Sequence, residues 1–380
     1  MENLVLYRKY RPRFFAEVVN QSHVIKTLTN AITMGKVAHA YLFCGPRGTG
    51  KTTVARILAK AVNCPSTNSG QASSKTSFEP CNKCDVCQEI NQGRSMDLIE
   101  IDAASNRGID EIRELREGIK FSPARLKYKV FIIDEVHMLT REAFNALLKT
   151  LEEPPSHAIF ILATTEIHKM PQTIISRCQR FDFHKFALPD IVERLKFVAG
   201  QEKVKIEKAA LELIALNADG AIRDAESLLG QVMAMEDKEI TLEEVQTILG
   251  TVDISTVVDM INFIIKKDTA GAITFINKIV EEGYDLGQFA KSLINYLRKM
   301  MILKTASQSD IAQFRNLIAP EFTDEQLKTI LEQGQKFSSG DLVRLIKLFI
   351  EAENQIKSAV FPQLPLELVV VELLGGTVKP

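Results

Sequence analysis

Tryptophan is absent from this 380-residue chain, and no apolar run reaches the about 20 residues that cross a bilayer. The first residues lack the apolar core and the small-residue cleavage site of a signal peptide. No segment repeats at the periods of solenoids or propellers. These absences argue against a membrane-spanning, secreted or repeat protein, and we expect a cytoplasmic protein with no membrane partner.

A charge excess is also missing, because the formal net charge is −1. The distribution is uneven, since residues 1–60 hold ten Lys or Arg and two acids, whereas residues 201–260 hold five bases and thirteen acids. Either the basic N-terminal part meets phosphate groups, or both parts are ordinary solvated surfaces. The hydrophobic share of 46% is typical of globular proteins, and the length predicts two to four compact units.

Three short apolar runs, at residues 40–45, 129–134 and 158–164, have the length and composition of buried strands. Helical periodicity follows the first run over residues 52–62, and strands that alternate with helices predict a parallel α/β sheet with helices on both faces. After about residue 183 the strand signals stop. From there we expect successive amphipathic helices to about residue 372.

The loop between the first strand and its helix matches the phosphate-binding pattern G-x-x-x-x-G-K-[ST]. Its eight residues are Gly45, Pro46, Arg47, Gly48, Thr49, Gly50, Lys51 and Thr52. Backbone N–H groups of such a P-loop converge on phosphates, Lys51 reaches the β and γ oxygens, and the Thr52 hydroxyl is a ligand for Mg²⁺. The pattern therefore predicts binding of ATP with Mg²⁺; a glycine-rich turn that matches by chance would lack the flanking strand and helix.

Polar groups follow the other two strands at the end where ligands collect in α/β sheets. Asp134 is placed to hold Mg²⁺ with Thr52, and Glu135 to polarise an attacking water. Thr165 follows the third strand and could hydrogen-bond the γ-phosphate or that water. Arg177, further along, is either a finger for a neighbouring subunit's ATP or one half of a surface salt bridge.

Four cysteines bracket the low-complexity stretch at residues 65–80: Cys64 before it, and Cys81, Cys84 and Cys87 at C-x₂-C-x₂-C spacing after it. Four thiolates in a reducing compartment favour a structural, tetrahedral Zn²⁺ site. An iron–sulfur cluster and a redox pair are the alternatives. The other cysteines, at positions 44 and 178, we expect to be small buried residues.

Several motifs together resemble one family, the gamma and tau subunits of the bacterial DNA polymerase III clamp loader, which are AAA+ ATPases. The resemblance rests on the P-loop, the four cysteines and the following segments: YRKYRP at 7–12, IDAAS at 101–105, IIDEVHML at 132–139, ALLKTLEEPP at 146–155, LATTE at 162–166, SRC at 176–178 and GAIRD at 220–224. It covers the first 230 residues in order and is diffuse beyond them.

The resemblance implies an AAA+ P-loop ATPase domain at 1–182 with the zinc module 64–87 inserted in it. A three-helix lid at 183–247 and an all-α collar that oligomerises at 248–372 would follow, with 373–380 as a tail or the start of a linker. It also implies a motor subunit that opens the sliding clamp and loads it onto primer–template DNA. Its partners would be delta-like and delta-prime-like subunits, further copies of itself and, through a longer C-terminus, polymerase and helicase.

The resemblance assigns roles to single residues. Thr165 is the sensor at the strand end, Arg177 the finger that acts in trans, and Arg223 the lid sensor that contacts the nucleotide. The remaining implied residues are Tyr7, Arg11, Pro12 and Val19 in the adenine pocket, Thr53 beside the P-loop, and Ser105, Arg107 and Arg113 on the DNA phosphates. The family usually has glycine where this chain has Asn20, a residue type that tolerates the left-handed conformation.

Two other functions remain open from the sequence. One is a clamp-loader scaffold that keeps the fold without hydrolysis, against which the intact Lys51, Asp134, Glu135 and Arg177 argue. The other is a different AAA+ motor that remodels DNA, against which the SRC triplet and the cysteines weigh.

Overall fold

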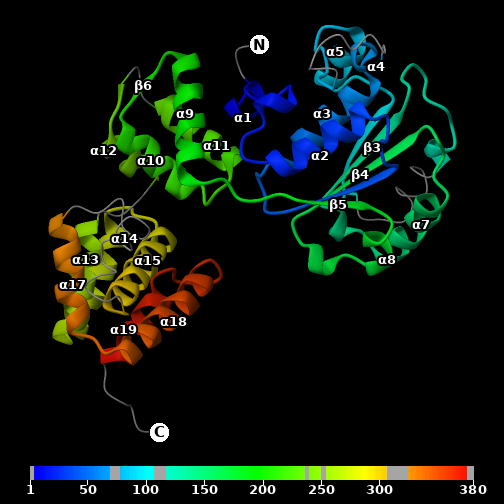
Figure 1. The fold of residues 1–380 in the computed structure, drawn as a ribbon. Coiled ribbons are helices and arrows are strands. Elements are labelled where there is room, and N and C mark those ends of the chain that lie inside the picture. The colour runs from blue at the N-terminus through cyan, green and yellow to red at the C-terminus, as the bar shows by residue number, and fades with distance from the viewer. Residues whose placement is uncertain are drawn as a thin grey trace. The chain divides into compact units, whose positions relative to one another are not determined.

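The computed structural model of the chain describes residues 4–68, 78–106, 117–235, 239–249, 254–305 and 324–374. Two compact units divide the chain, Met1–Thr241 and Leu242–Pro380 (Figure 1). The first unit holds a five-stranded sheet with its covering helices and a further group of helices with a two-stranded sheet, and the regular elements described in the second unit are all helices.

Five parallel strands form the sheet of the first unit, in the order β2-β3-β4-β1-β5. Their bounds are β1 Ala40–Cys44, β2 Leu98–Asp102, β3 Lys129–Asp134, β4 Ala158–Thr164 and β5 Gln179–Asp182. The predicted parallel α/β sheet is thereby confirmed, with β1, β3 and β4 where the apolar runs lie. The sequence reading missed β2 and β5 because these are the two edge strands, which are partly exposed and so lack a continuous apolar run.

Helices cover both faces of this sheet, as expected. Tyr41 and Phe43 of β1 share a core with α2 and α3, while Leu42 between them shares a core with α7 and α8 on the other face. The elements of this part besides the strands are α1 Leu6–Lys9, η1 Phe15–Glu17, α2 Ser22–Thr33, α3 Lys51–Asn63, α4 Pro65–Asn68, α5 Asp85–Asn91, η2 Val136–Met138, α7 Arg141–Glu152, η3 Ile167–Lys169 and α8 Gln172–Ile175.

A group of three helices completes the first unit, as the sequence predicted for the lid. These are α9 Leu188–Glu202, α10 Lys208–Asn217 and α11 Ile222–Met235. The expectation of helices alone after residue 183 was wrong in one detail, because β6 Lys205–Ile206 and β7 Glu239–Ile240 pair in parallel. Two residues a strand are too short to leave a periodic signal in the sequence.

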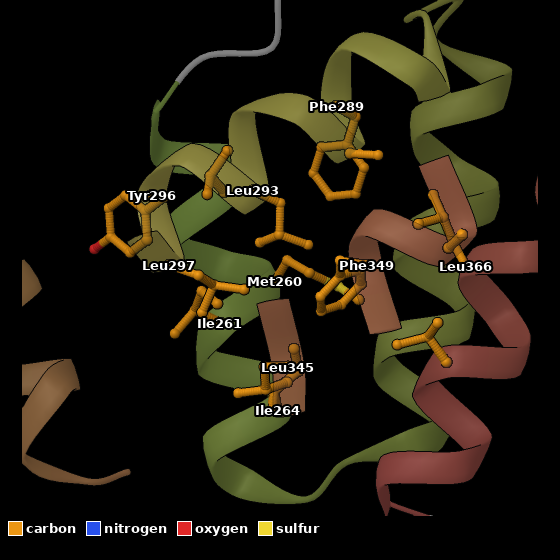
Figure 2. Close-up of a cluster of buried hydrophobic side chains, with 14 of the residues drawn as sticks. Met260, Ile261, Ile264, Phe289, Leu293, Tyr296, Leu297, Leu345, Phe349 and Leu366 are labelled. Atoms are coloured by element: carbon orange, nitrogen blue, oxygen red, sulfur yellow. The ribbon is translucent and has the colours of Figure 1, made fainter. Parts of the chain in front are cut away.

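The described helices of the second unit are α12 Leu242–Leu249, α13 Ile254–Lys266, α14 Thr269–Glu281, α15 Leu286–Thr305, α17 Asp324–Gln335, α18 Ser339–Ile356 and α19 Leu364–Leu374. From α13 onward, these helices pack around one apolar core, part of which Figure 2 shows. Because α19 runs to Leu374, the predicted tail at 373–380 begins inside a helix, and the rest of it lies outside the described residues.

No single described helix is long and apolar enough to cross a membrane. The neighbours α12 and α13 reach that standard only when they are taken together, and the apolar residues Val257, Met260, Ile261 and Ile264 of α13 are buried in the core of the second unit.

Candidate active site

The P-loop joins β1 to α3 in backbone conformations that only glycine adopts without strain. Gly45 has φ +147°, and a Cβ atom there would lie 2.3 Å from the carbonyl oxygen of Phe183. Gly48 has φ +75°, and a Cβ atom there would lie 2.7 Å from the Cβ of Ala221 at the start of the lid helix α11. The glycines thus let the loop pass close to the sheet on one side and to the lid on the other.

Lys51 begins α3 and turns its side chain back into the loop. Its ammonium donates hydrogen bonds to the carbonyl oxygens of Gly45, at 2.7 Å, and Pro46, at 2.8 Å. Burial lowers the pKa of this lysine, while the nearby carboxylates of Glu135 and Asp134 act in the opposite direction. A buried ammonium at a helix N-terminus is suited to bind phosphate oxygens.

The acidic pair meets the P-loop at the end of β3. The Thr52 hydroxyl donates to Asp134 Oδ2 at 2.7 Å, so the two groups predicted to hold Mg²⁺ lie together. Glu135 Oε2 accepts hydrogen bonds from the Thr165 hydroxyl, at 2.8 Å, and from the Thr165 backbone N–H, at 3.2 Å. Residues from the start of α3 and from the ends of the neighbouring strands β3 and β4 therefore converge, and Thr165 fixes the carboxylate of Glu135.

A pocket of about 490 Å³ opens beside these groups, which is a volume typical of small-ligand sites. Its lining from the predicted set comprises Tyr7, Arg11, Pro12, Val19, Arg47, Gly48, Thr49, Gly50, Lys51, Thr52, Thr53, Asp134, Glu135 and Arg223. The Arg223 guanidinium lies 4.8 Å from the centre of the Tyr7 ring and, by hydrogen bonding, lowers the pKa of that tyrosine. Asn20, where the family usually has glycine, adopts φ +54°.

Sequence analysis predicted no role for several residues of this region, among them His137, Arg194 and Glu226. His137 is almost fully buried beside the acidic pair, with its Nδ1 2.9 Å from the Thr164 hydroxyl and 3.4 Å from Glu135 Oε2. Arg194 and Glu226, from the lid helices, form an ion pair of 2.8 Å that lines the pocket, and burial raises the pKa of Glu226. His137 lies in the motif IIDEVHML, which was the one sequence signal for it. The Arg194–Glu226 ion pair belongs to no local motif.

The residues predicted to act outside the pocket have different surroundings. The Arg177 guanidinium pairs with Glu152 at 2.5 Å and donates to the Thr173 carbonyl, away from the pocket of its own chain. The Ser105 hydroxyl donates to Asp102 at 3.2 Å. Arg107 and Arg113, the other residues predicted to bind DNA, lie outside the described residues.

The four bracketing cysteines gather into one cluster, with sulfur atoms all within 4.8 Å of one another. Three of them belong to a small segment, Phe78–Asn91, that we call the cysteine module. Although burial acts in the opposite direction, backbone N–H groups of Lys83 and Cys84 lower the pKa of the Cys81 thiol to about 6. Such a cluster could hold a metal ion. Of the other two cysteines, Cys44 is buried as expected, whereas Cys178 is only partly buried, and that burial raises its pKa to about 12.

Family models match most of the chain in three consecutive parts. Residues 20–187 match the DNA polymerase III delta subunit, residues 190–238 the ATPase lid domain of the DNA polymerase III clamp loader subunit, and residues 240–378 domain III of the DNA polymerase III subunits gamma and tau.

Curated relatives give the same result. The chain is 42% identical to the DNA polymerase III subunit tau of Bacillus subtilis, over 98% of this chain and 63% of the relative. It is 40% identical to the Escherichia coli subunit tau, over 80% of this chain and 46% of the relative. It is 34% identical to the subunit gamma of Buchnera aphidicola from Acyrthosiphon pisum, over 99% of this chain and 100% of the relative. The chain therefore spans the whole of this gamma relative but less than two thirds of both tau relatives.

Proposed function

This chain belongs to the family of gamma and tau subunits of bacterial DNA polymerase III, and from that premise we propose that it is the ATP-hydrolysing motor subunit of a clamp loader. The observation that carries the proposal is the meeting of Thr52 and Asp134 at 2.7 Å beside a Glu135 held by Thr165. A scaffold subunit without hydrolysis would have no use for that convergence.

The phosphate side of the pocket does the chemistry. The N–H groups of the P-loop and the ammonium of Lys51 bind the phosphates, and Glu135 orients and polarises the attacking water. Thr52 and Asp134 would hold Mg²⁺, which when bound with ATP neutralises charge on the β and γ oxygens. Thr165 restrains Glu135 through the hydrogen bonds described above, and Arg223 in the lid faces the nucleotide beside Tyr7.

Arg177 supplies the group that this site lacks. Because its guanidinium lies away from the pocket of its own chain, we propose that it reaches the ATP of a neighbouring subunit, where it stabilises charge in the transition state. Its ion pair with Glu152 holds it at the surface until assembly. The neighbours are further copies of the chain and delta-like and delta-prime-like subunits, joined through the helical second unit.

The cysteine cluster suits structural Zn²⁺. A tetrahedral zinc with Zn–S bonds of about 2.3 Å separates its sulfurs by about 3.8 Å, and the four sulfur atoms here lie within 4.8 Å of one another. Cys64, Cys81, Cys84 and Cys87 would all be ligands, which leaves no open position for catalysis.

DNA and the sliding clamp are the proposed targets of the motor in the cytoplasm. Primer–template DNA would contact Ser105, Arg107 and Arg113 through its phosphates, so binding would be sensitive to salt and indifferent to sequence. DNA entry would trigger hydrolysis and release the clamp. A longer C-terminus would serve polymerase and helicase.

An ATPase assay of the assembled loader tests this function. Turnover is expected to rise when primed DNA and clamp are added together, and each alone is the control. Turnover without any response to the two together would favour a different AAA+ motor, and the absence of turnover would favour the scaffold.

A further inference from the structure

The segment from Arg11 to Asn20 lines one side of the pocket, although it contains no regular element except the three-residue η1. Its members Arg11, Pro12, Val18 and Val19 all belong to the lining. The segment satisfies some of its backbone N–H groups itself, since Arg13 N–H donates to Glu17 Oε2 at 2.6 Å, and others bond to distant parts of the chain. We call residues 11–20 the base-side segment.

Glu79 of the cysteine module closes the beginning of η1. Its two carboxylate oxygens accept hydrogen bonds from the backbone N–H groups of Phe15 and Ala16, each at 2.9 Å. The residue before η1 offers no side-chain cap of its own. A carboxylate 63 and 64 positions away therefore caps this short helix, by charge-assisted hydrogen bonds that are stronger than neutral ones.

Asn82, between two of the clustered cysteines, holds the same segment at a second point. Its side-chain amide donates to the Arg13 carbonyl at 3.0 Å, and Lys60 donates to that carbonyl at 2.9 Å. Lys60 also donates to Asn82 Oδ1 at 2.7 Å and to Asn91 Oδ1 at 2.9 Å. The buried ammonium of Lys60 thus joins the base-side segment to the cysteine module.

Lys60 belongs to α3, the helix whose first residue is the P-loop lysine. Helix α5 of the cysteine module lies beside α3 (Figure 1). The module is consequently fixed to the helix that carries the phosphate site, and through Glu79 and Asn82 it fixes the base-side segment to that same helix.

We propose that the cysteine module braces the base side of the nucleotide pocket, with Glu79 and Asn82 as its positioning residues. This inference rests on the proposed function, because it requires an adenine nucleotide in the pocket. The module contributes no group to hydrolysis. When the contacts between the module and the base-side segment are lost, the pocket binds the adenosine part of the nucleotide more weakly, while the phosphate site stays intact.

Two ligands separate these effects: ADP, which has both parts, and inorganic tripolyphosphate, which has no base or ribose. We expect Glu79→Ala in the full chain to raise the Kd for ADP by about tenfold, since a charge-assisted cap is lost. The Kd for tripolyphosphate should change less than about twofold, and calorimetric titration measures both. Glu79→Gln, which keeps the shape and one acceptor oxygen, should show a smaller rise and serves if the alanine variant does not fold.

Glu89→Gln is the matched control, because Glu89 lies in the same module and pairs with Arg125 rather than with the base-side segment. Its Kd values and the metal content of all variants should equal those of the unmodified chain. Unchanged ADP binding in Glu79→Ala, or an equal loss of affinity for both ligands, would contradict the proposal that the cysteine module positions the base-side segment. An unmodified chain that binds neither ligand would contradict the proposed function itself.

Discussion

The two units of the chain differ in how they treat buried charge. Among the described residues, four charged side chains are buried in the first unit, namely Lys51, Lys60, Asp97 and Glu226, and one in the second, Lys299. Burying a charge is costly unless partners compensate it, and Asp97, for example, accepts three backbone hydrogen bonds of 2.8 to 3.0 Å. Three of these four charged side chains in the first unit lie at its pocket: Lys51 and Glu226 line it, and Lys60 holds the base-side segment. The core of the second unit is apolar (Figure 2).

The largest expected effect tests whether the first unit of one chain holds the whole hydrolytic site. Arg177→Ala should lower turnover of the assembled loader by about 10³-fold, because an arginine finger is lost from the neighbouring site. ATP binding should stay nearly unchanged, as filter binding would report. Arg180→Ala, which removes an exposed arginine paired with Asp182, is the control. Lost ATP binding would show that Arg177 acts within its own chain.

Glu135→Gln tests the chemistry of the phosphate side. Loss of the carboxylate should reduce ATP turnover by at least about 10²-fold, while binding persists, because the amide cannot take a proton from water. Single-turnover hydrolysis in the assembled loader measures the effect against Glu153→Gln, an exposed glutamate of the same unit. Equal rates in both variants would remove Glu135 from the mechanism.

Gly48→Ala tests the close approach of the P-loop and the lid. The added Cβ would meet Ala221 at 2.7 Å, so the Kd for ATP should rise by about tenfold or more. Gly35→Ala has a similar positive φ of +65° with no atom within 4 Å, and so reproduces the backbone strain without the collision. Gly35→Ala should lose about 1–2 kcal/mol of stability through backbone strain alone, and Gly48→Ala at least as much because the collision adds to it. Only Gly48→Ala should lose affinity for ATP.

The smallest expected effect concerns Lys299, the one charged side chain that is buried among the described residues of the second unit. Burial lowers the pKa of Lys299 to about 8, with the charge of Arg298 acting in the same direction. Between pH 8 and the ordinary value of 10.5, the unfolded chain retains a proton that the folded chain has lost, so stability rises with pH in this window. Lys299→Met should abolish a rise on the order of 1 kcal/mol.

Hydrogen exchange of the α15 peptides, corrected for intrinsic rates, measures this slope. Lys291→Met, which removes a half-exposed lysine from the same helix, should keep the rise of the unmodified chain. Identical slopes in the two variants would mean that Lys299 does not titrate in this window.

The parts of the site that could be predicted from sequence are those built by consecutive residues. The P-loop and the acidic pair follow strands buried on both faces, which leave apolar runs that are easy to recognise. The resemblance implied Arg11, Pro12 and Val19 of the base-side segment, but not the contacts that hold this segment, because Glu79 and Lys60 reach it from distant positions. The Arg194–Glu226 ion pair likewise forms only when the lid helices α9 and α11 pack together, so no local sequence pattern predicts it.

The order of the strands also dictates when this site can form. Strand β1, which leads into the P-loop, pairs with β4 on one side and β5 on the other, and both partners follow it by more than a hundred residues. Contacts of such long sequence separation must overcome loop-closure entropy before they stabilise the chain, which is typical of slower folding. On the ribosome, the P-loop would thus remain unsupported until residue 182 has emerged, and the chain acquires its nucleotide pocket only with the lid.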